Sequence, residues 1–168
     1  MKARALTPLI NHPERNKSMK HYIKTISWRF HDSSVAYPGL KDSKLYMTSP
    51  SDVMKSFQFL FKDEVRERFL VIWLNSANRV TGFEIVTEGI LNSSIVHPRE
   101  VYRGAIVATA ASIIIAHNHP SGNGEPSAED ISITRQIAEA GKIIGIPLND
   151  HVIFADHNYT SFAERGLL

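Results

Sequence analysis

Short apolar runs separated by turn residues recur from about residue 49 to the end of the chain. Two of them, Arg68 to Leu74 and Val80 to Val86, flank a turn at Asn75 to Asn78, which predicts an antiparallel hairpin. The run Ile113 to Ala116 is short and β-branched, so it predicts a buried central strand. A further strand is expected at Val152 to Phe154.

Between these runs the chain carries the start signals of three helices. Ser49, Pro50 and Asp52 form a cap, a proline at the first position and an acid in the first turn. Pro98 and Ser127 open two further apolar-periodic segments. Helices are therefore predicted over residues 50–62, 99–111 and 127–144. Helices alternating with strands predict an α/β fold, a single mixed-sheet layer flanked by helices.

The composition of the chain excludes several classes of protein. At 43% hydrophobic and 21% charged residues, the chain is typical of globular domains. It holds no run of 18 apolar residues and no apolar segment after its basic start, so we expect no membrane span and no secretory signal. The absence of cysteine excludes disulfides and thiolate metal sites, and with them the zinc deaminases. A cytoplasmic location is expected.

The charge is divided unevenly along the chain. Residues 1–44 hold nine Lys or Arg against three Asp or Glu, a net +6, whereas the remainder sums to −4. We predict that residues 1–45 form a basic, partly irregular N-terminal extension, with a strand at Tyr22 to Phe30, and that residues 46–168 form the domain. A basic arm can contact nucleic acid weakly, but a solvated, partly disordered tail is the commoner interpretation of such a segment.

The candidate chemistry lies directly after the central strand. His117 and His119 are two residues apart, so both imidazoles point to one face at the strand end. Pro120, Gly122 and their neighbours force a tight loop, and Ser127 then caps a helix that carries Asp130 in its first turn. Two imidazoles and a carboxylate, with a fourth position open, are the ligand set of a catalytic zinc.

Each half of this pattern has a plainer interpretation. A His-x-His pair at a strand end is commonly a surface feature, and Ser127-x-x-Asp130 also fits a simple capping box. The combination beside one loop favours a metal site. Other metallohydrolases fit less well, because Ser121 and Gly122 replace the Asp-His of the metallo-β-lactamase pattern. Amidohydrolases place His-x-His on a barrel of about 250 residues, too long for this chain.

The spacing His117-x-His119, seven residues, Ser127, two residues, Asp130 resembles the JAB/MPN metalloenzyme motif, also called JAMM. The segment His-Asn-His-Pro-Ser-Gly is similar to the corresponding sequence in the RadC-like branch of this family. Two flanking segments resemble that branch as well, Val96 to Val101 and Asp150 to Ile153. The resemblance runs from about Ser51 to Leu168 and implies a JAB/MPN, cytidine-deaminase-like fold with a Zn²⁺ ion.

The resemblance also implies roles for further residues. The family's general base is a glutamate at the start of an early strand, which points to Glu67, with Glu64 as the rival. Ser127 would help to stabilise the oxyanion. The implied activity is that of a zinc metallopeptidase acting on amide bonds, peptide or isopeptide, in a peptide or protein substrate. The alternative is a RadC-type accessory protein of DNA repair that contacts nucleic acid through residues 1–44. His151 fits either a role behind the metal or a structural one.

Overall fold

The computed structural model describes residues 45–89, 96–156 and 158–168. A five-stranded mixed sheet runs through this part of the chain in the order β2-β1-β3-β4-β5. Strands β3 and β4 pair in parallel, and the other neighbours are antiparallel. The bounds are β1 Glu67–Leu74, β2 Val80–Gly89, β3 Ser112–Asn118, β4 Leu148–Ala155 and β5 Asn158–Ser161. The sheet is thus the mixed one expected, with β3 buried at every position.

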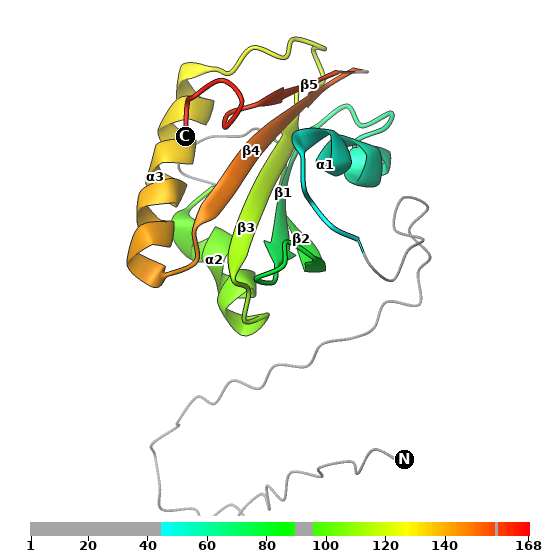
Figure 1. The fold of residues 1–168 in the computed structure, drawn as a ribbon. Helices are drawn as coiled ribbons and strands as arrows, with labels where there is room; N and C mark the ends of the chain where they lie inside the picture. The colour runs from blue at the N-terminus through cyan, green and yellow to red at the C-terminus, as the bar shows by residue number, and fades with distance from the viewer. Residues whose placement is uncertain (1–44, 90–95, 157) are drawn as a thin grey trace, which may run out of the picture. The chain divides into compact units, whose positions relative to one another are not determined.

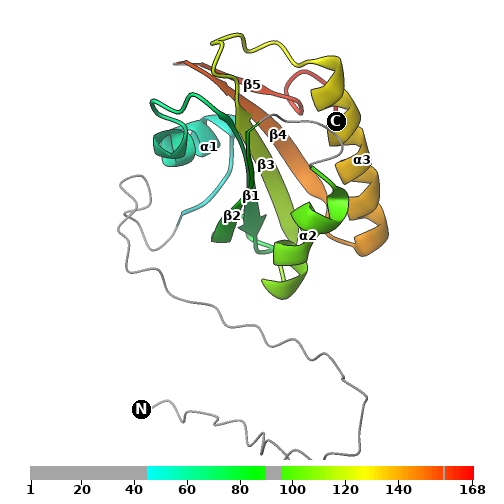
Figure 2. The ribbon, with the colours of Figure 1, turned by 180° about the vertical axis from the view of Figure 1, so that it is seen from behind.

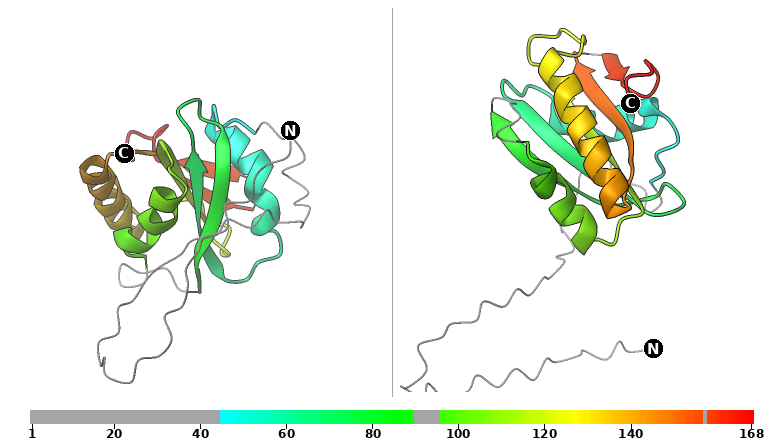
Figure 3. Two further views of the ribbon diagram at one scale, coloured as in Figure 1. Left: turned by 90° about the horizontal axis from the view of Figure 1, so that it is seen from below. Right: turned by 90° about the vertical axis from the view of Figure 1, so that its left-hand side faces the viewer.

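Helices cover both faces of the sheet. Helices α2, Pro98–Val107, and α3, Ala128–Ile144, lie on one face, and α1, Pro50–Phe57, lies on the other (Figure 1). The view from behind and the view from below show the same three layers (Figures 2 and 3). A 3₁₀ turn, Gln58–Leu60, follows α1. No helix of the described residues is long and apolar enough to cross a bilayer.

Side-chain alternation along the strands divides the core in two. Ile113 and Ile115 of β3 pack with the residues of α2 and α3, whereas Ile114 and Ala116 pack with those of α1. Because side chains alternate along a strand, His117 continues the α3 side. The central strand therefore aims His117 at the face that α3 covers.

The observed helices end earlier than predicted in two places. The first helix gives way to the 3₁₀ turn after Phe57 instead of running to residue 62. The second ends at Val107 instead of residue 111, because Thr109 adopts a left-handed backbone (φ 50°) and Ala110 N–H bonds back to the carbonyl of Ala105. Such a reversal closes a helix end in the way that capping motifs do.

Two strand predictions need correction or extension. Strand β4 begins at Leu148, four residues before the predicted Val152, and β5 was not predicted. The segment Asn158–Ser161 carries too few apolar residues to show the alternation of a strand. It is held in the extended conformation by its pairing with β4. The strand predicted at Tyr22 to Phe30 and the basic extension lie outside the described residues.

Candidate metal centre

A strand, a loop and a helix bring the three predicted ligands together. The Nε2 atoms of His117 and His119 are 3.0 Å apart. Asp130 Oδ1 lies 3.2 Å from His117 Nε2, and Asp130 Oδ2 lies 3.4 Å from His119 Nε2. His117 is fully buried, and the side chains of Asp130 and His119 are 7% and 13% exposed. The expected convergence of two imidazoles and a carboxylate is present.

The loop after β3 sets the orientation of His119. The Nδ1 atom of His119 lies 2.6 Å from the carbonyl oxygen of Asn123. A carbonyl only accepts hydrogen bonds, so Nδ1 carries the proton and Nε2 presents its lone pair in the neutral ring. Gly122 makes the tight return possible: its φ is +76°, and its N–H bonds to the carbonyl of His119.

A capping box at the start of α3 holds Asp130. Ser127 N–H and Ser127 Oγ donate to Asp130 Oδ2 at 2.8 and 2.6 Å, and Asp130 N–H donates to Ser127 Oγ at 3.0 Å. The predicted N-cap role of Ser127 is therefore confirmed. Oδ2 is occupied by these donors, whereas Oδ1 faces His117.

Burial and charge oppose each other at these three groups. Burial raises the pKa of Asp130, but hydrogen bonds from protonated His117 and His119 and from Ser127 outweigh it and hold that pKa well below the usual range of a carboxyl. Burial lowers the pKa of His117, with partial compensation by Asp130. The hydrogen bond that the protonated ring donates to Asp130 raises the pKa of the less buried His119. The carboxylate is thus ionised and attracts a cation.

The donor set suits a metal ion. One ligand atom from each of His117, His119 and Asp130 lies within 4.8 Å of the others. Two ring nitrogens 3.0 Å apart, one of them held as an acceptor by its loop, repel each other unless a cation or proton sits between them. The three groups can therefore hold a metal ion, and a tetrahedral ion keeps one further position for solvent or substrate.

Glu67 and Glu64 lie in different surroundings. Glu67 opens β1, and the pairing of Phe69 with His117 places Glu67 at the end of the sheet where the ligands are. The charge of Glu67 raises the pKa values of both His117 and His119. Glu64 instead forms an ion pair with Arg68.

Asn118 fastens the backbone on either side of Glu67. Its amide donates to the carbonyl of Arg66 at 3.0 Å, and its Oδ1 accepts from Arg68 N–H at 2.8 Å. These two bonds connect the histidine strand to the start of β1. Sequence reasoning did not assign Asn118 a role, although its place between two candidate ligands was a usable signal.

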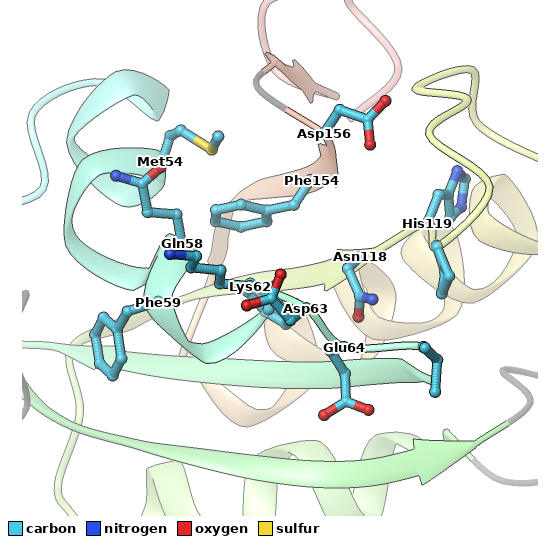
Figure 4. Close-up of a pocket in the computed structure, with 13 residues that line it drawn as sticks. Met54, Gln58, Phe59, Lys62, Asp63, Glu64, Asn118, His119, Phe154 and Asp156 are labelled. Carbon is cyan, nitrogen blue, oxygen red and sulfur yellow. The ribbon is translucent and has the colours of Figure 1, made fainter.

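A groove opens on the side of His119 (Figure 4). Its volume is about 1190 Å³, and it lies between the ends of β3 and β4 and the segment after α1. The wall is partly apolar and partly charged. It is lined by Met54, Gln58, Phe59, Phe61, Lys62, Asp63, Glu64, Val65, Asn118, His119, Pro120, Phe154 and Asp156. Of the three candidate ligands, His119 is the one that lines this groove.

His151 is a functional candidate that the sequence left undecided. It is fully buried, and its Nε2 lies 2.7 Å from His117 Nδ1. Its Nδ1 lies 2.6 Å from Thr134 Oγ1, a residue that the sequence did not single out. The other flanking histidine, His97, is the N-cap of α2, and its side chain accepts a hydrogen bond from Arg99 N–H.

Comparison with known proteins agrees with this geometry. Residues 47–167 match the model of the RadC-like JAB domain. A UPF0758 protein of Salinibacter ruber is 50% identical over 76% of this chain and 55% of that protein. One of Pelobacter propionicus is 50% identical over 72% and 53%, and one of Methanosarcina mazei 39% identical over 77% and 56%. The chain spans about half the length of these relatives. The chain belongs to the RadC-like JAB domain family.

Proposed function

We propose that this chain is a zinc-dependent hydrolase of amide bonds, peptide or isopeptide, in a peptide or protein substrate. The observation that carries the proposal is the convergence of His117, His119 and Asp130 within 4.8 Å, beside a groove of about 1190 Å³. Zinc bound there supplies a Lewis acid and lowers the pKa of a coordinated water to about 7.

The residues of the chain then divide the remaining work. His117, His119 and Asp130 bind the ion, and the buried positions of His117 and Asp130 exclude bulk water from one side. Glu67 takes the proton of the attacking water and passes it to the leaving amine. Its support is its place at the head of β1 and its electrostatic effect on both histidines.

Ser127 is proposed to assist the oxyanion. Its hydroxyl proton is donated to Asp130 Oδ2 at 2.6 Å, so this role requires the hydroxyl to rotate towards the substrate while its backbone N–H keeps the carboxylate in place. A donor already aimed at the oxyanion is worth about 2.7–4 kcal/mol, and the hydrogen bond to Asp130 that the Ser127 hydroxyl must give up reduces this value.

The proposal is tested by separating zinc content from turnover. Lysate proteins whose amines have been blocked serve as substrate, because each cleaved amide then releases one new amine that labelling and mass spectrometry detect. Glu67→Gln should keep its zinc and lose amine release by at least 100-fold. Glu64→Gln is the matched control and should remain active, since Glu64 pairs with Arg68. Full activity of Glu67→Gln would exclude Glu67 as the base, and no amine release by the zinc-loaded wild type would refute the hydrolase proposal.

The nucleic-acid alternative concerns residues 1–44, which lie outside the described residues. It remains a prediction that follows from their net charge of +6. Binding of this kind weakens steeply with salt and disappears when residues 1–44 are deleted. Binding that does not depend on salt would count against it.

A further inference from the structure

A buried chain of hydrogen bonds runs behind the candidate metal ligands. His117 Nδ1 lies 2.7 Å from His151 Nε2, and His151 Nδ1 lies 2.6 Å from Thr134 Oγ1. Thr134 Oγ1 lies 2.5 Å from the main-chain carbonyl oxygen of Asp130. All four residues are buried. The chain therefore connects a ligand on β3 to a ligand on α3 through a residue of β4.

Only one assignment of donors and acceptors satisfies all the hydrogen bonds in this chain. The carbonyl of Asp130 only accepts, so the single hydroxyl proton of Thr134 is donated to it. Thr134 Oγ1 must then accept from His151 Nδ1–H, which leaves His151 Nε2 as an acceptor. His151 Nε2 in turn requires a proton on His117 Nδ1. The Nε2 atom of His117 is thereby left with its lone pair directed at Asp130 and His119.

We infer that His151 is a positioning residue that, together with Thr134, selects the tautomer in which His117 can bind a metal ion. The inference rests on the metal site of the proposed function, but not on hydrolysis. The reverse direction would put the proton of His117 on Nε2, where a metal ligand needs a lone pair. Partners behind metal-bound histidines commonly contribute 10- to 100-fold in metal affinity.

An imidazole as the acceptor behind His117 affects the charge at the metal site differently from a carboxylate. A carboxylate behind a metal-bound histidine adds negative charge, whereas a neutral His151 adds none. Among the three ligands only Asp130 is anionic, so the ion retains more of its positive charge. His151 thus orients His117 without weakening the ion as a Lewis acid.

A purely structural role for His151 predicts different behaviour. The ring of His151 stacks on Phe162 with centroids 4.6 Å apart, and it lies 5.9 Å from Phe69. If filling this space were its whole contribution, Phe would replace it better than Gln. If the hydrogen bond to His117 matters, Gln is the better replacement, because its side-chain oxygen can occupy the place of the ring Nε2 and accept the same proton.

The decisive experiment compares zinc affinities of His151→Phe and His151→Gln in the full chain, by competition with a chromophoric chelator. We expect His151→Phe to bind zinc at least tenfold more weakly than His151→Gln. In the zinc-loaded wild type, ¹⁵N NMR should show the proton of His117 on Nδ1. A difference of less than tenfold, or a proton on His117 Nε2, overturns the inference. A wild type that binds no zinc would instead refute the metal site, so the two failures are distinguishable.

A second pair of variants answers the question if His151→Phe does not fold, as judged by thermal unfolding of the metal-free protein. Thr134→Ser keeps the hydroxyl that accepts from His151, whereas Thr134→Val removes it and nearly preserves the volume. We expect Thr134→Ser to bind zinc like the wild type and Thr134→Val to bind it several-fold more weakly. Equal affinities of these two variants overturn the inference.

Discussion

Replacing Asp130 by Asn changes the candidate metal centre while leaving its scaffold in place. The side-chain oxygen of Asn can still accept from Ser127 N–H and Ser127 Oγ, which now hold Oδ2 of the aspartate at 2.8 and 2.6 Å. The amide nitrogen must therefore occupy the place of Oδ1, 3.2 Å from His117 Nε2. There it presents two N–H donors where a ligand needs a lone pair.

The expected loss of zinc affinity follows from the removal of one ligand. Four-ligand structural zinc sites are worth about 10–16 kcal/mol, so one ligand corresponds to roughly 3–4 kcal/mol, or about 10²–10³ in Kd. The metal-free fold should lose less than about 1 kcal/mol. The capping bonds persist, only the charge at the helix N-terminus is lost, and the new amide can donate to His117.

Zinc titration of the metal-free proteins measures the change in Kd, and urea unfolding measures the change in the free energy of unfolding. Zinc at 100 times the wild-type Kd should stabilise the wild type by about 2.7 kcal/mol and Asp130→Asn by about 0.4 kcal/mol or less. Glu129→Gln is the matched control, because it removes a neighbouring acid from the same helix turn without removing a candidate ligand. A Kd for Asp130→Asn within threefold of the wild type would refute the assignment of Asp130 as a ligand.

Three further predictions concern the surroundings of the ligands. Asn118→Ala should keep zinc but lower amine release, because the backbone that carries Glu67 loses two hydrogen bonds, and unchanged release would contradict this. Gly122→Ala should lower the free energy of unfolding by about 1–2 kcal/mol, since φ is +76° and a Cβ would lie 2.6 Å from Asp156 Oδ2; urea unfolding tests it. In the metal-free protein, the protonated form of His119 stabilises the fold below the unfolded pKa of about 6.5, and this contribution is lost as the pH rises through its raised folded pKa. The stability difference between wild type and His119→Gln should shrink over that range, and a difference that grows would be inconsistent with it.

The ligand set could be predicted from local spacing because each part of it is a local structure. An apolar run ending in His117-x-His119 fixes two side chains on one face of a strand, and Ser127 fixes the helix turn of Asp130. Strands β1 to β3 could also be predicted, because each contains an apolar run bounded by turn residues.

The contacts behind the ligands depend on pairing between distant segments. His151 reaches His117 only because β4 pairs in parallel with β3 in a register that matches Ile115 with His151. Thr134 lies one helical turn beyond Asp130, where the period of α3 gives no sign of a polar contact. Edge strand β5 is defined by its hydrogen bonds to β4 more than by its residues. Such features follow from tertiary arrangement, which one sequence does not display.

Elemental analysis of the purified chain, after saturation with zinc and removal of the excess, tests the candidate metal centre most directly. We predict one zinc per chain for the wild type and almost none for His119→Ala or Asp130→Asn, with all three proteins folded. Equal zinc contents in the wild type and both variants, or a wild type without zinc, would contradict it.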